Sequence, residues 1–147
     1  MEKQSTEHTL TLKDTLLNDS TGFIPIPRQL SLVLGLNATT LLVELYDRYD
    51  YYSSKELLNT YGEFFYTISD VETNIGLSRK EQNTAINILK DYNFIKRIIS
   101  RSIPAKRYFL MNTNITKLLK DIYKEAEEKK TKIIERNKSE IERILGL

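Results

Sequence analysis

The chain has 147 residues, with 22 basic and 20 acidic side chains, a formal net charge of +2, no cysteine and one histidine. Disulfide bonds, thiolate catalysis and zinc–thiolate sites are therefore excluded, and His8, alone in a polar stretch, supports neither a histidine metal cluster nor Ser-His-Asp catalysis. No apolar run approaches the roughly 18 residues of a membrane span, and no signal-peptide pattern opens the chain. We expect one domain with an appendage, in a soluble, cytoplasmic protein that uses no membrane, metal or cofactor.

The N-terminal part is predicted to be a tail followed by two helices. Residues 1–22 are polar and turn-like, which indicates a flexible tail. Two prolines favour an extended piece at a sheet edge over residues 23–26. Pro27 suits a first helical position, so a short helix is expected up to Leu34, ended by Gly35. Asn37 is a good N-cap, and we expect a second helix to begin there.

A helix-turn-helix is the most specific local pattern in the chain. Residues 64–67 favour a β-strand, and a capping box at residues 69–72 then predicts a short helix that Gly76 can end. A second capping box at residues 78–81 opens a helix that runs to about Tyr92. Two short helices joined by a turn of this kind form a helix-turn-helix.

A β-hairpin and a long helix follow. Residues 94–99 and 107–111 are predicted strands, joined by the basic connection at residues 100–106. The expected fold is mainly α with a small β-hairpin (α+β): a winged helix-turn-helix domain at residues 23–112. Residues 113–147 form its C-terminal extension, mostly a single long helix.

The C-terminal helix has two apolar stretches with a polar interval between them. The proximal stretch can pack on the domain, whereas the distal one needs another surface or remains solvated. A second copy of the chain is the simplest such surface, although the interrupted pattern is a poor heptad repeat. Contact with a dimer mate or a partner protein is therefore predicted for Ile133, Ile134, Ile141, Ile144 and Leu145.

Positive charge is concentrated in one window. Residues 78–107 carry eight basic and two acidic side chains, whereas residues 1–77 carry six more acidic than basic ones. Asymmetry of this kind is typical of a polyanion site, although a solvated basic face without a partner gives the same pattern. It predicts docking through one face, with the acidic part turned away.

The helix predicted at residues 78–92 has the two faces of a DNA-reading helix. Aliphatic side chains lie on one side, and amides and cations lie on the other. Asn83 and Asn87 are the expected base readers, because asparagine can pair bidentately with adenine. The helix N-terminus and the basic wing at residues 96–107 are expected to contact phosphates. The predicted DNA-binding residues are Ser78, Arg79, Lys80, Asn83, Thr84, Asn87, Lys90, Lys96, Arg97, Arg101, Ser102, Lys106 and Arg107.

The stretch from Phe64 to Asn112 resembles the winged-helix modules of plasmid and phage replication proteins of Gram-positive bacteria, which include DnaD-like N-terminal domains and replisome organisers. The resemblance is carried by residues 65–67, 70–72, 76–79, 85–86, 89, 94–95 and 103–109. It implies a winged-helix fold and a DNA-associated role in plasmid or phage maintenance, and it does not choose between replication and transcription.

Two functions of different classes remain open. The leading hypothesis is a sequence-specific, dimeric, double-stranded DNA-binding protein that acts in replication, partition or transcriptional regulation of a plasmid or phage, in association with the nucleoid or plasmid. The alternative is a protein-interaction or dimerisation module that docks a replication or partition protein without sequence-specific DNA binding of its own. An enzyme is not expected, because the sequence contains no phosphate-cradling glycine loop, metal-ligand spacing or nucleophile–base pair.

Overall fold

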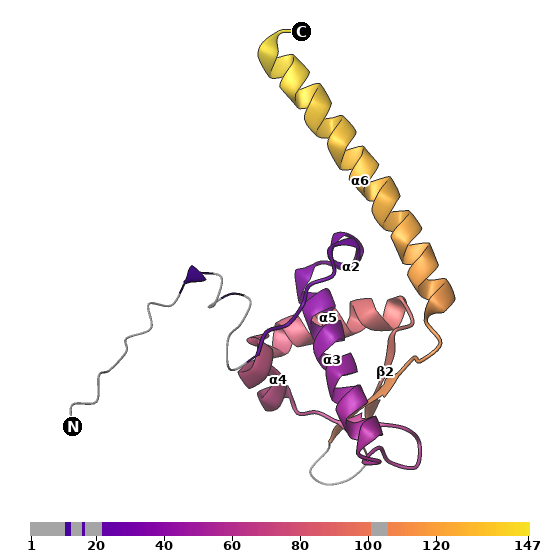
Figure 1. The fold of residues 1–147 in the computed structure, drawn as a ribbon. Helices are drawn as coiled ribbons and strands as arrows, with labels where there is room; N and C mark the ends of the chain where they lie inside the picture. The colour runs from indigo at the N-terminus through magenta and orange to yellow at the C-terminus, as the bar shows by residue number, and fades with distance from the viewer. Residues whose placement is uncertain (1–10, 13–15, 17–21, 101–105) are drawn as a thin grey trace, which may run out of the picture.

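The computed structural model describes residues 11–12, 16, 22–100 and 106–147. The elements are α2 (Arg28–Leu34), α3 (Leu36–Ser54), β1 (Phe64–Phe65), α4 (Ile68–Ile75), α5 (Arg79–Asp91), β2 (Ile95–Ile99), β3 (Arg107–Met111) and α6 (Thr116–Leu145) (Figure 1). Most of the predicted N-terminal tail lies outside the described residues, as do Arg101 and Ser102. Within the described part of the chain, no helix is long and apolar enough to cross a membrane.

The three strands form one antiparallel sheet in the order β1-β3-β2. The hairpin β2–β3 is the wing, with Arg97 opposite Phe109 and Ile98 opposite Tyr108, and β1 adds to the free edge of β3 through Phe64 and Phe109. In chain order the domain consists of the helix pair α2 and α3, strand β1, the helix pair α4 and α5, and the hairpin. Helix α6 then projects away from the domain (Figure 1). The predicted α+β class and the winged helix-turn-helix with a long C-terminal helix are confirmed.

The turn between α4 and α5 forms as its residue types dictate. Gly76 adopts a left-handed conformation (φ 74°) and ends α4, a geometry that costs other residues free energy. Ser78 then caps α5: its hydroxyl accepts a hydrogen bond from the Glu81 amide at 3.2 Å, and the Glu81 carboxylate accepts one from the Ser78 amide at 3.1 Å. The predicted capping box of α5 is therefore confirmed.

The beginnings of the other helices differ from the prediction. Thr67, not Ser69, caps α4, because the Thr67 hydroxyl accepts a hydrogen bond from the Asp70 amide. Asn37 is not an N-cap but the second residue of α3, and Gly35 alone separates α2 from α3. Pro27 is the N-cap of α2 rather than its first helical residue.

Residues 23–26 and 113–115 also depart from the prediction. Residues 23–26 join no strand of the sheet, whose free β3 edge is taken by β1. The last helix begins at Thr116 rather than near residue 113, because Asn112 forms a turn first: its side-chain oxygen accepts a hydrogen bond from the Asn114 amide at 3.0 Å.

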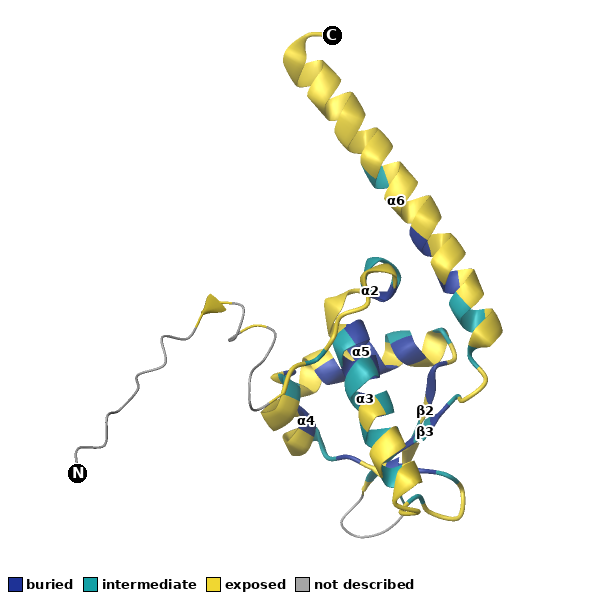
Figure 2. Ribbon diagram, in the orientation of Figure 1, coloured by how far each residue is buried: buried dark blue, intermediate teal, exposed yellow. Residues whose placement is uncertain are grey.

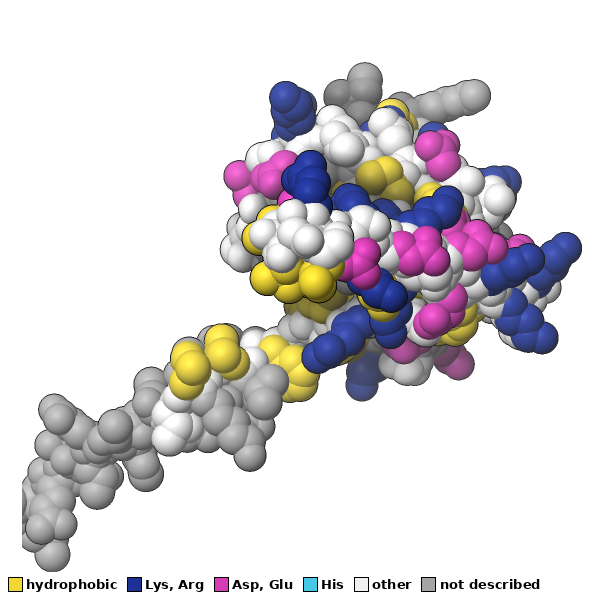
Figure 3. Space-filling view, turned by 90° about the horizontal axis from the view of Figure 1, so that it is seen from above, with side chains coloured by type: hydrophobic (Ala, Val, Ile, Leu, Met, Phe, Trp, Pro, Cys, Tyr) yellow, Lys and Arg dark blue, Asp and Glu magenta, His cyan; other side chains and the backbone are white. Residues whose placement is uncertain are grey.

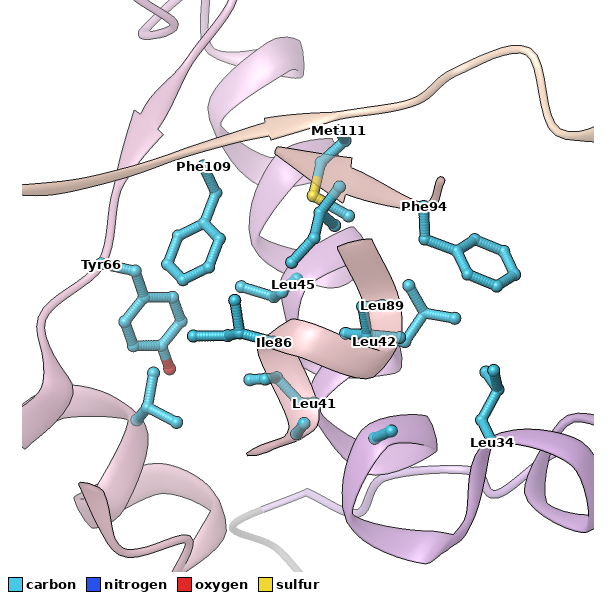
Figure 4. Close-up of a cluster of buried hydrophobic side chains, with 14 of the residues drawn as sticks. Leu34, Leu41, Leu42, Leu45, Tyr66, Ile86, Leu89, Phe94, Phe109 and Met111 are labelled. Carbon is cyan, nitrogen blue, oxygen red and sulfur yellow. The ribbon is translucent and has the colours of Figure 1, made fainter. Parts of the chain in front are cut away.

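The hydrophobic core lies where α3, α5 and the inner face of the sheet meet (Figure 4). Figure 2 shows buried residues concentrated there and α6 exposed over most of its length. Each large aliphatic or aromatic side chain buried in this way contributes about 1.5–3 kcal/mol. The side chains drawn and labelled in the close-up are Leu34, Leu41, Leu42, Leu45, Tyr66, Ile86, Leu89, Phe94, Phe109 and Met111.

The first half of α6 is anchored on the domain. Ile122 and Ala126 are each 1% exposed, and the Lys129 ammonium donates a hydrogen bond to the Leu32 carbonyl of α2 at 2.6 Å. The Tyr92 hydroxyl, at the end of α5, is bonded to Glu125 at 3.0 Å. The proximal apolar stretch packs on the domain as predicted, because Ile122 is in the core and Ile115, Leu118 and Leu119 pack against it.

Candidate nucleic-acid interface

Helix α5 presents a buried face and an exposed polar face, as its amphipathic pattern predicts. Gln82, Ala85, Ile86 and Leu89 are buried against the core. The opposite face is exposed, and its side chains are amides, hydroxyls and cations, with Glu81 near its start and Asp91 at its end. We call the exposed members of this face that were predicted to contact DNA the reading face; they are Arg79, Lys80, Asn83, Thr84, Asn87 and Lys90.

The wing contacts the reading face directly. A nitrogen of the Arg97 guanidinium donates to the side-chain oxygen of Asn83 at 3.4 Å, which joins β2 to α5. The Thr84 hydroxyl donates to the Lys80 carbonyl one turn earlier, at 3.1 Å, so it is used within the helix. The predicted base reader Asn83 is thus already oriented by a cation that can itself reach a phosphate.

The predicted wing residues divide between the two faces of the hairpin. Lys96 pairs with Leu110 and Arg97 with Phe109, so these adjacent side chains point to opposite faces of the sheet. Lys106 lies on the Lys96 side, with its ammonium 5.4 Å from the centre of the Phe65 ring. Arg97 is therefore next to the reading face, whereas Lys96 and Lys106 can contact only what approaches the edge or the outer face of the wing.

Arg107 departs most from its predicted role. Its guanidinium is turned into the domain, where Nε donates to the Tyr66 carbonyl at 3.0 Å and Nη1 donates to the Gln82 side chain at 2.9 Å. Burial, together with the nearby charge of Arg97, lowers the pKa of Arg107 to about 10. Arg107 still carries its charge at neutral pH, but it connects elements inside the domain rather than offering a free cation to DNA.

Gln82 lies on the core-facing side of α5, and the sequence did not predict the hydrogen bonds that it makes there. Its side chain is fully buried and donates to the carbonyls of Ile68 at 3.0 Å and Leu77 at 2.8 Å, while its oxygen accepts from Arg107. Gln82 thereby ties the start of α4, the turn and the wing to α5. A glutamine on the core-facing side of an amphipathic helix is the signal that could have revealed this role, because buried amides need hydrogen-bond partners.

The start of α5 carries a negative charge, although the net charge of residues 78–107 is positive. The Glu81 carboxylate lies at this helix end, where it accepts hydrogen bonds from the Ser78 amide and, at 3.3 Å, from the Asn37 side chain. These bonds, chiefly the one from the Ser78 backbone, lower the pKa of Glu81. The predicted phosphate site at the α5 N-terminus is therefore shared with a fixed negative charge, and Ser78 is occupied as a cap.

Acidic side chains are also exposed elsewhere on the helix-turn-helix. Asp91 is exposed at the end of α5, and Asp70 and Glu72 are exposed on α4. Figure 3 shows the end of the molecule where α6 terminates, and there too basic and acidic side chains are interspersed. Among the described residues, no group of acidic or histidine side chains is placed to hold a metal ion.

The distal residues of α6 make few contacts with the rest of the described structure. Ile133 is half-buried, whereas the other predicted contact residues are more than half exposed. These exposed residues are Ile134, Ile141, Ile144 and Leu145.

No protein-family model matches this sequence, and no curated protein and no solved structure matches it either. The functional argument therefore depends on the arrangement of the residues described above.

Proposed function

We propose that the protein binds double-stranded DNA, with the reading face of α5 in the major groove and the wing beside it. The observation that carries this proposal is the exposed polar face of α5 with Arg97 of the wing bonded to Asn83 at 3.4 Å. An α-helix fits the major groove, and amide side chains can pair with the edge of adenine there. Arg79, Lys80 and Arg97 supply charge for the phosphates on either side.

The resemblance to plasmid and phage replication modules supports a role in the replication, partition or transcription of a mobile element, in the bacterial cytoplasm. The acidic groups around the reading face favour a specific orientation over diffuse binding. Glu81 and Asp91 repel phosphates at the two ends of α5, whereas Asn83 and Asn87 between them carry no charge. Affinity should therefore depend strongly on how the helix is seated in the groove.

A titration of labelled duplexes from around the gene tests the proposal. We expect binding that weakens steeply as salt rises, because each neutralised phosphate releases counterions. Lys80→Ala should weaken binding to all sequences alike and reduce the salt slope by about 1. Lys120→Ala removes another exposed lysine, on α6, and serves as the matched control. Absence of binding at low salt, or equal binding by the Lys80 variant, would show that α5 is not the DNA-binding helix.

One observation favours the second candidate, a protein-interaction module: the apolar side chains exposed along the end of α6. A chain truncated after Lys132 separates the two functions, since it keeps the buried Ala126 and the Lys129 bond to the domain. If the truncated domain loses a protein partner and neither form binds DNA, the interaction module is the better description.

A further inference from the structure

Three isoleucines form one line along α6. Ile122, Ile133 and Ile144 are spaced 11 residues apart, and 11 residues make three turns of a helix, so the three side chains project from the same side. Their burial decreases along this line: Ile122 is 1% exposed, Ile133 is half-buried and Ile144 is 73% exposed. The exposed end is therefore a continuation of the surface that packs on the domain.

A groove marks the point where the domain stops covering this line. Leu32 of α2 faces Ala126, Ile133 and Ile134 of α6 across a cavity of about 470 Å³. A second hollow continues from Ile134 along α6 to Ile141. Together they form an apolar track, open to solvent, that begins at an existing contact between two helices and runs toward the C-terminal end.

We propose that a second copy of this chain occupies this track, with the distal halves of the two α6 helices packed antiparallel. Each helix would then place Ile144 and Leu145 in the groove between α2 and α6 of the other copy. The arrangement has two-fold symmetry, so one surface serves both partners and the contact closes at a dimer.

The domain itself decides the direction of the two helices. Helix α2 already lies on the line at Ile122 and Ala126, so each domain is on the side of α6 that the partner helix must approach. Two parallel helices would bring both domains to the same end and between the helices. Antiparallel helices place the domains at opposite ends, with free apolar residues from Ile133 to Leu145 over about 20 Å.

Charge balance favours a second copy over a charged partner. The segment from residue 135 to residue 143 carries three acidic and three basic side chains, all exposed. A segment without net charge does not repel an identical segment, and it gives a strongly acidic or basic protein no electrostatic advantage. The six side chains are Glu135, Arg136, Lys138, Glu140, Glu142 and Arg143.

The oligomeric state of the full chain over a concentration series is the first test. We expect the mass measured by light scattering to rise from one chain to two, and Ile141→Lys with Ile144→Lys to hold it at one chain. Ser139→Lys adds one lysine on the other side of the helix, about 160° from Ile141 and about 140° from Ile144, and should leave the dimer intact. Circular dichroism of each variant checks that α6 still forms. A monomer at every concentration, or a dimer unaffected by the two isoleucine changes, overturns the proposal.

Disulfide trapping tests the direction of the helices, and the absence of native cysteine makes it clean. Gln29 lines the groove. When the Gln29→Cys protein is mixed with the Ile144→Cys protein, we expect a disulfide between one chain of each kind. Ile144→Cys alone should not cross-link, because antiparallel pairing holds the two positions about 16 Å apart. Rapid self-linking of Ile144→Cys, without the mixed product, would overturn the antiparallel arrangement.

Discussion

Gln82 and Asn83 are adjacent residues with the same functional group and opposite surroundings. The Gln82 side chain is fully buried and has three hydrogen-bond partners inside the domain, whereas Asn83 is exposed and has one partner, from the wing. One amide therefore holds the helix-turn-helix together, and the other is available to a ligand. The difference shows that polarity alone does not identify a recognition residue; its position around the helix does.

The largest expected effect is on the buried side of this comparison. Gln82→Ala removes the hydrogen bonds to Ile68 and Leu77, and it leaves the half-buried Arg107 guanidinium with its Tyr66 bond alone. We expect a loss of about 2–4 kcal/mol in the free energy of unfolding, measured by urea denaturation. Asn83→Ala is the matched control and should change it by less than about 0.5 kcal/mol. Equal effects of the two variants would contradict the distinction between them.

The next effect concerns the exposed side, under the proposed DNA-binding function. Asn87→Ala should cost about 1–3 kcal/mol of binding free energy on a preferred sequence and leave binding to unrelated duplexes unchanged. The reason is that a contact with a base edge distinguishes one sequence from another, whereas a phosphate contact does not. Competition binding with the two kinds of duplex measures this. Asn114→Ala, which removes an exposed amide ahead of α6, is the control. A uniform loss on all sequences would assign Asn87 to the phosphate backbone instead.

The smallest expected effect is a pH dependence of stability that arises from Glu81, at the start of α5. The hydrogen bonds at the start of α5 lower the pKa of Glu81 in the folded state below its usual value of 4.5. The stability they add is therefore present above about pH 4.5 and is lost as the pH falls through the lowered pKa. Thermal melting of the protein and of Glu81→Gln should differ at neutral pH and converge in acid. A constant difference across this range would show that the charge of Glu81 does not matter.

The elements with strong local signals could be predicted from the sequence. The capping box at Ser78, the left-handed Gly76 and the amphipathic pattern of α5 each depend on a few neighbouring residues, and all three are observed. The wing strands could be placed for the same reason, since β-favouring runs flank a polar connection.

The errors arose where distant parts of the chain decide. Asn37 is a good cap by residue type, but it lies inside α3, and its side-chain amide is bonded instead to Glu81 of α5, 44 residues away. Arg107 is a basic residue of the wing, so its residue type alone predicts a free cation. The pairing register of β3 places Arg107 on the inner face with Phe109, and its side chain therefore reaches Gln82. Local sequence does not contain the register of a hairpin whose connection is long.

The single residue between α2 and α3 has a consequence for the whole molecule. Gly35 adopts φ 84° and ψ 165°, a region almost closed to other residues, although an added Cβ would meet no atom within 4 Å. The constraint is therefore one of backbone torsion and not of space. Gly35 sets the angle between α2 and α3, and α2 in turn contacts the middle of α6, where Lys129 donates a hydrogen bond to the Leu32 carbonyl. The torsion angles of this one glycine therefore also determine the width of the groove between α2 and the distal half of α6.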